Sequence, residues 1–164
     1  MFTKGKTFLF LVILAGLTAA AVLRLTLYSD AASPYSSDSN KQLKSTALGL
    51  VTKIRGLVDS YNKKDRELMA DYQTNYLTSR TTERQRIRGQ YEKNLKEATD
   101  STVRDYKEKL LAESKTVRAE LHRRLPERLH RPNLSKIYEK PSFVMEIEII
   151  ADDLELLSKS LPDT

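Results

Sequence analysis

The chain has 164 residues, a formal net charge of +6, and 40 % hydrophobic against 30 % charged side chains. It contains no cysteine, which excludes disulfides, thiol catalysis and cysteine-ligated metal sites. With five glycines and no tryptophan, the sequence has little of the turn chemistry of a sheet, so its composition favours an all-α fold stabilised by helix packing.

Residues 1–28 carry the strongest hydrophobic signal. Lys4 and Lys6 precede a run without a charged residue that extends over residues 7–23, and Arg24 follows it. This pattern predicts a single transmembrane helix of the signal-anchor type, with the Arg24 side chain reaching the lipid headgroups. A short basic head before an apolar run is typical of export, so we expect the bulk of the chain to be extracytoplasmic, in the periplasm or outside the cell.

A cleaved signal peptide is the alternative, because Ala19 and Ala21 supply small residues for a cleavage site. Residues 29–40 are rich in serine, aspartate and asparagine, and they predict a flexible linker.

Residues 41–125 contain no proline, and their apolar residues recur at steps of three and four, as on one face of a helix. The hydroxyl-rich stretch 79–82 interrupts the pattern, and Thr82 with Gln85 fits a capping box. We therefore predict a long, coiled-coil-like antiparallel hairpin that turns near 79–82. One continuous helix of about 85 residues is the alternative, and it would need a partner along its whole length.

Three prolines interrupt residues 126–141, which we expect to form a connector. Residues 142–161 then show apolar positions at steps of four and three, with Ser142 as the expected N-cap. The pattern predicts a C-terminal amphipathic helix that packs back on the hairpin. A strand over residues 143–150 is the local alternative, given its β-branched residues.

The stripes also predict which side chains pack between the helices. If the chain reverses at 79–82, Leu50 faces Leu110 and Leu57 faces Val103. The expected packing residues are Leu50, Ile54, Leu57, Tyr61, Val103, Tyr106, Leu110, Ile147, Ile150, Leu154 and Leu157.

Charge is unevenly distributed along the chain. Residues 41–131 carry 22 basic and 13 acidic side chains, whereas residues 132–164 carry three basic and seven acidic ones. Five arginines crowd the end of the hairpin: Arg118, Arg123, Arg124, Arg128 and Arg131. Solvated charges and anionic lipid headgroups are the competing interpretations of this cluster. Nucleic acid is disfavoured, because the tyrosines lie on the apolar stripes rather than beside the arginines.

No constellation of catalytic, metal-binding or cofactor-binding residues is evident, so we expect neither an enzyme nor a cofactor. The sequence instead predicts a single-pass membrane-anchored interaction or scaffold protein. Its expected partners are the membrane, another protein or a second copy contacted through the helices, and anionic lipid. A secreted α-helical effector or ligand-binding protein is the alternative.

Overall fold

The computed structural model describes residues 33–163, and the compact unit considered below is Ser37–Thr164. The predicted anchor at residues 1–28 and the first part of the predicted linker lie outside the described residues. The described part of the chain is helical and contains no strand, which confirms the all-α prediction. None of its helices combines the length and the apolar character that a membrane span requires.

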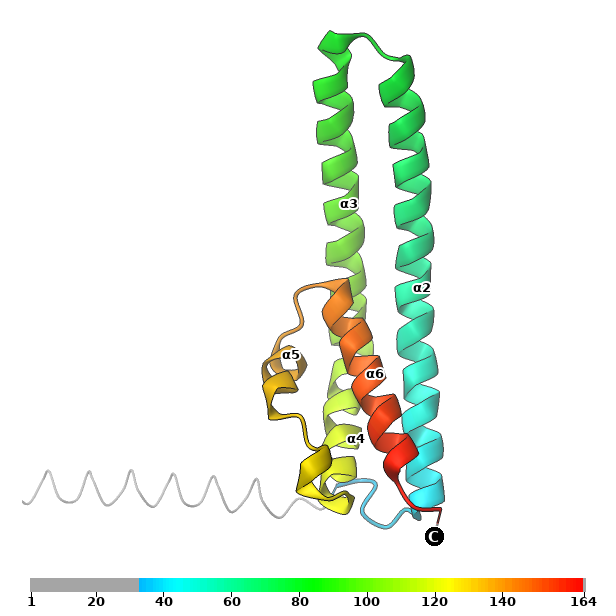
Figure 1. The fold of residues 1–164 in the computed structure, drawn as a ribbon, viewed down its shortest axis with the longest axis vertical. Coiled ribbons are helices and arrows are strands. Elements are labelled where there is room, and N and C mark those ends of the chain that lie inside the picture. Colours follow the sequence, from blue (N-terminus) through cyan, green and yellow to red (C-terminus); the bar gives the residue numbers. More distant parts are fainter. Residues whose placement is uncertain (1–32, 164) are drawn as a thin grey trace, which may run out of the picture. The chain divides into compact units, whose positions relative to one another are not determined.

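Two long antiparallel helices form the frame of this unit (Figure 1). Helix α2 runs over Asn40–Thr78 and helix α3 over Thr81–Lys109, and the chain reverses through two extended residues, Ser79 and Arg80. Tyr61 Oη lies 3.3 Å from Thr99 Oγ1, which sets the register between the helices. A single continuous helix through residues 79–82 is therefore excluded.

The two helix starts differ in how they are capped. Ser39 caps α2 with a capping box, because its Oγ accepts from the Gln42 N–H at 3.2 Å while Gln42 Oε1 accepts from the Ser39 N–H at 2.8 Å. The end of the predicted flexible linker is thus fixed in the fold. The capping box expected at Thr82 is wrong, since α3 begins at Thr81 after Arg80 and has no side-chain cap.

The second half of the hairpin, after the turn, is not one helix, contrary to expectation. Leu110 departs from helical geometry with φ −126° and ψ −24°, and helix α4 follows over Leu111–Arg124. The buried Ser114 donates to the Leu110 carbonyl from both its backbone N–H, at 2.9 Å, and its hydroxyl, at 2.8 Å. A serine hydroxyl that bonds back to a carbonyl four residues earlier often bends a helix, and here that bond coincides with the break.

The prolines shape the connector as predicted from their chemistry. It contains two 3₁₀ turns, η1 over Glu127–Leu129 and η2 over Pro132–Leu134, and a short helix α5 over Ser135–Glu139. The connector leads into the last helix, α6, over Val144–Ser160.

Helix α6 begins one residue later than expected. Its N-cap is Phe143 rather than Ser142, and the Glu146 carboxylate accepts from the backbone N–H groups of Ser142 and Phe143 at 2.5 and 3.0 Å. These bonds satisfy backbone donors that a helix start leaves free, and the acidic side chain also suits the positive end of the helix dipole. The strand considered for residues 143–150 is excluded.

The core lies where α6 packs against α2 and α4 (Figure 1). Of the expected packing residues, Leu57, Tyr61 and Leu110 are half-buried. The others are buried, namely Leu50, Ile54, Val103, Tyr106, Ile147, Ile150, Leu154 and Leu157.

Burial ends abruptly along the hairpin. The buried residues of α2 lie between Leu43 and Val58, those of α3 lie between Ala98 and Tyr106, and no residue from 59 to 97 is buried. We call residues 59–97 the arm and the remainder of the unit the base. The arm has only two helices because α6 begins at Val144, beside Tyr61 and Asn62, so the apolar residues further along the arm keep one side in water.

The seating of α6 can be tested with two leucines two positions apart. Leu154 is fully buried whereas Leu156 is 40 % exposed. Leu154→Ala should lower the free energy of unfolding by about 2–5 kcal/mol through lost transfer energy and a residual cavity, and Leu156→Ala by much less. Urea unfolding followed by circular dichroism measures both. Equal losses would mean that α6 presents a different face to the hairpin.

Candidate interaction surfaces

The five arginines predicted as an anionic-surface site do not form one free cationic patch. Arg118 is nearly buried, with 11 % of its side chain exposed. Its Nε donates to Asp153 Oδ2 at 3.0 Å and its Nη2 donates to the Arg131 carbonyl at 2.8 Å. The guanidinium also lies over the Tyr138 ring, 4.4 Å from the centroid. Arg118 therefore joins α4 to the connector and to α6, and it is not available to a lipid.

Asp153 is the fully buried partner in this network. Its Oδ2 also lies 3.2 Å from the hydroxyl of Tyr138, and burial raises the pKa of that phenol, so the hydroxyl stays protonated and donates to the carboxylate. The other oxygen, Oδ1, has no hydrogen-bond partner among the described residues. A buried carboxylate depends on such partners, so Arg118 and Tyr138 together hold α6 in place.

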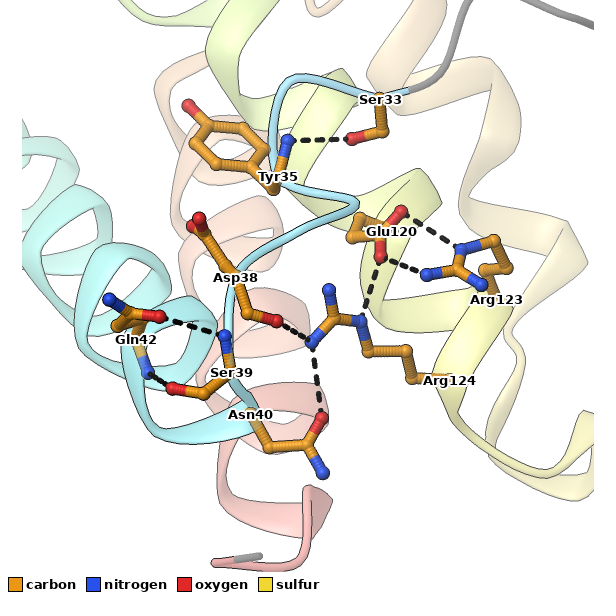
Figure 2. Close-up of polar contacts among 9 residues, drawn as sticks. All are labelled: Ser33, Tyr35, Asp38, Ser39, Asn40, Gln42, Glu120, Arg123 and Arg124. Carbon is orange, nitrogen blue, oxygen red and sulfur yellow. Dashed lines mark hydrogen bonds and ion pairs between the residues drawn. The ribbon is translucent and has the colours of Figure 1, made fainter.

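Arg123 and Arg124 are bound by a second buried carboxylate, as Figure 2 shows. Glu120 is 1 % exposed, and it accepts from Arg123 Nη2 at 2.6 Å and from Arg124 Nε at 2.7 Å. The hydrogen bonds from Arg123, which has the larger effect, and from Arg124 hold the pKa of the Glu120 carboxyl below its usual value. Arg124 Nη1 donates to the Asp38 carbonyl at 2.8 Å, so the end of α4 is tied to the residues that lead into α2.

Arg128 and Arg131 are the members of the cluster whose side chains are exposed and make no ion pair among the described residues. Arg123 is exposed over 61 % of its side chain but shares Glu120. The surface that sequence reasoning assigned to five arginines is thus reduced to two free cations and one paired cation.

Two histidines stack beside this network. The rings of His122 and His130 are 4.2 Å apart and nearly parallel, and His130 Nε2 lies 2.9 Å from the His122 carbonyl and 3.2 Å from that of Leu125. Facing two acceptors, this nitrogen carries a proton and caps the end of α4. His122 Nε2 is buried without a partner among the described residues. Burial, then the nearby Arg118 and His130, lower the pKa of His122, whereas Asp153 raises it.

The distal end of the arm carries features that the sequence analysis did not single out. The rings of Tyr72 and Tyr91 pack across the hairpin with centroids 4.8 Å apart, and Tyr76 lies 5.3 Å from Tyr72. The guanidinium of Arg84 lies 4.9 Å from the centroid of the Tyr76 ring. The sequence signal that could have pointed to this region was the high density of arginine between positions 80 and 88. These arginines form one surface only once the chain reverses.

Within the described range, no group of three or more histidine, aspartate or glutamate side chains is arranged to hold a metal ion. No family model, no curated protein and no solved structure matches the chain. The function must therefore be argued from the surfaces alone.

The buried ion pair can be tested with two adjacent aspartates. Asp153→Asn leaves the buried guanidinium of Arg118 without its counterion, so unfolding should cost about 3 kcal/mol less. Asp152→Asn is the control, since Asp152 pairs with Arg55 on an exposed surface and its loss should leave the urea midpoint nearly unchanged. Similar midpoints for both variants would show that the buried pair does not hold α6.

The histidine stack predicts a pH dependence. Burial lowers the pKa of His122 in the folded state, so the contribution of its neutral form to stability is complete above the unfolded pKa of about 6.5 and is lost as the pH falls below it. His122→Asn should therefore lose less stability than the unmodified chain between pH 7.5 and 5.5. Urea titrations at both pH values measure the difference, and identical losses would rule out His122 as the source.

Proposed function

We propose that the chain is a single-pass membrane-anchored interaction protein that holds its base near the membrane and extends its arm to a protein partner. The bare two-helix arm is the observation that carries this proposal. Its helices expose one side of every apolar residue between positions 59 and 97, which a self-contained bundle would cover.

The proposed orientation rests on where the chain enters the base. Arg124 binds the Asp38 carbonyl, so the end of α4 lies beside the start of α2. Residues 1–28, whose composition predicts the anchor, connect to this end through the linker. Helix α2 has 39 residues, so the turn at Ser79 lies about 58 Å away at 1.5 Å per residue. The arm can therefore reach a partner about 58 Å from the start of α2.

Anionic lipid has a smaller proposed role than the sequence suggested. Arg128 and Arg131 lie in the connector that follows α4, and each would attract an anionic surface by roughly 1 kcal/mol. Two such cations can orient the base against lipid headgroups, but they are too few to hold the protein at the membrane. The anchor supplies retention in the bilayer.

A secreted helical effector, with its signal peptide removed, is the second candidate. The core of the base favours it, because the described residues between Leu43 and Leu161 bury a core among themselves. In that case the same arm would reach a target in solution.

Fractionation and mass measurement separate the two candidates. The membrane-anchored protein should resist alkaline carbonate extraction and retain the full-length mass, since about 20 apolar residues hold a helix in the bilayer. A chain lacking residues 1–32 should become soluble and keep the circular dichroism of a helical fold. A mature protein that lacks its first residues and is found in the soluble fraction would overturn the anchored form.

A further inference from the structure

The distal end of the arm carries arginines that the hairpin leaves unpaired. Residues 71–92 contain four arginines, at positions 80, 84, 86 and 88, and three acidic residues, Asp71, Glu83 and Glu92. Arg88 pairs with Glu92 at 2.8 Å, but Arg80, Arg84 and Arg86 make no ion pair among the described residues. Arg84 Nε is buried without a hydrogen-bond partner in that same part of the chain. An unpaired guanidinium at a dense cluster of cations favours an acidic partner.

A hollow with a mixed polar and apolar lining adjoins Arg86. A cavity of about 370 Å³ opens between the two helices, and Leu68, Tyr72, Ile87 and Tyr91 form its apolar lining. The polar part of its lining consists of Asp71, Asn75, Ser79, Arg86, Gln90 and Asn94. Leu77, one residue from the end of α2, is 76 % exposed. The surface thus combines space for apolar side chains with guanidinium groups for carboxylates.

The base shows which kind of helix packs on a basic and apolar surface of this hairpin. Helix α6 is apolar on one face and carries the acidic residues Glu146, Glu148, Asp152, Asp153 and Glu155. Arg55 of α2 binds the carboxylates of Asp152 and Glu155, and Arg118 of α4 binds Asp153. The same helix pair continues into the arm past the start of α6, with its own cations and apolar positions (Figure 1).

From this internal precedent we propose that the distal arm, through Arg80, Arg84 and Arg86 and the hollow beside them, binds an acidic amphipathic helix of a partner protein. The proposal rests on the interaction function proposed above and names the chemistry of the partner. The apolar side chains of the partner enter the hollow and its carboxylates meet the guanidinium groups, as α6 does on the base.

Phosphate polymers fit this surface less well. Tyr72 and Tyr91 pack their rings on one another, so they do not offer free faces on which bases stack. Leu68 and Ile87 in the hollow would also stay exposed under a ligand that contacts only charge. The combination of arginines with a partly apolar cavity, which also contains Asp71, favours a helix over a polyanion.

The test uses the full chain in nanodiscs of neutral lipid and a synthetic peptide with the sequence of residues 142–161 as the acidic amphipathic probe. A second peptide has its five acidic residues replaced by Gln or Asn. Fluorescence anisotropy should show binding of the acidic peptide that weakens as salt rises and is weakened at least about tenfold in the neutral analogue.

Matched charge variants locate the binding. The triple variant Arg80→Gln, Arg84→Gln, Arg86→Gln should weaken binding of the acidic peptide about tenfold. The control triple variant Lys63→Gln, Lys64→Gln, Arg66→Gln removes the same charge from exposed positions lower on the arm, and it should change the affinity by less than about threefold. All variants should keep the helical circular dichroism of the unmodified chain.

Several outcomes would overturn the proposal. If both triple variants weaken binding of the acidic peptide equally, the effect is one of net charge. If Arg55→Gln weakens binding as much as the Arg80, Arg84, Arg86 triple variant does, the peptide replaces α6 at the base. Tighter binding of a DNA oligonucleotide or of anionic vesicles through the same arginines would assign the surface to phosphate. No binding of the acidic peptide by a chain that is still retained in membranes would reject this partner and leave the proposed membrane-anchored function standing.

Discussion

The packing of α6 between α2 and α4 is the contact on which the rest of the structure depends. Two helices alone leave one side of each interface residue in water, so the hairpin by itself cannot bury a core. Where α6 lies, Leu50, Ile54 and Leu154 become buried, and where α6 is absent no residue is. The length of one acidic helix thus divides the hairpin into a stable base and an arm with little stability of its own. The arm gains most from a partner for the same reason.

The helical elements were predictable because their signals are local. Apolar spacing, the hydroxyl cluster near Ser79 and the prolines of the connector each act through neighbouring backbone, so helix pairing and the position of the turn followed from the sequence. The capping box at Ser39 and Gln42 was equally readable, but the serine-rich composition around it favoured a linker. The break at Leu110 was not readable, because no proline or glycine marks it and hydroxyls such as that of Thr102 make the same bond to a carbonyl four residues earlier within an unbroken helix.

The candidate site was harder to predict, because charge on a helix does not reveal whether it is paired. Arg118 and Arg124 look like Arg128 in the sequence, yet the first two bind carboxylates that become buried only in the fold. Glu120 lies within four residues of both Arg123 and Arg124, so that pairing had a local signal. Asp153 lies 35 residues from Arg118, and only the return of α6 brings them together. Arg80, Arg84 and Arg86 of the distal arm were missed for the opposite reason. They stay unpaired among the described residues because no helix covers them, and the sequence does not show where α6 ends its contact with the hairpin.

The buried charges also explain why α6 occupies the base rather than sliding into the arm. The apolar stripes of the hairpin continue into the arm, so apolar packing alone would allow α6 to shift by one heptad toward the turn. That shift would move Asp153 from the level of Arg118 to that of Leu111, and it would move Asp152 and Glu155 from Arg55 toward Asn62. A carboxylate buried against leucine costs several kcal/mol, which is more than a displaced apolar contact can recover. We infer that the ion pairs set the register of α6, and that they thereby leave the distal arm free of the chain's own helix.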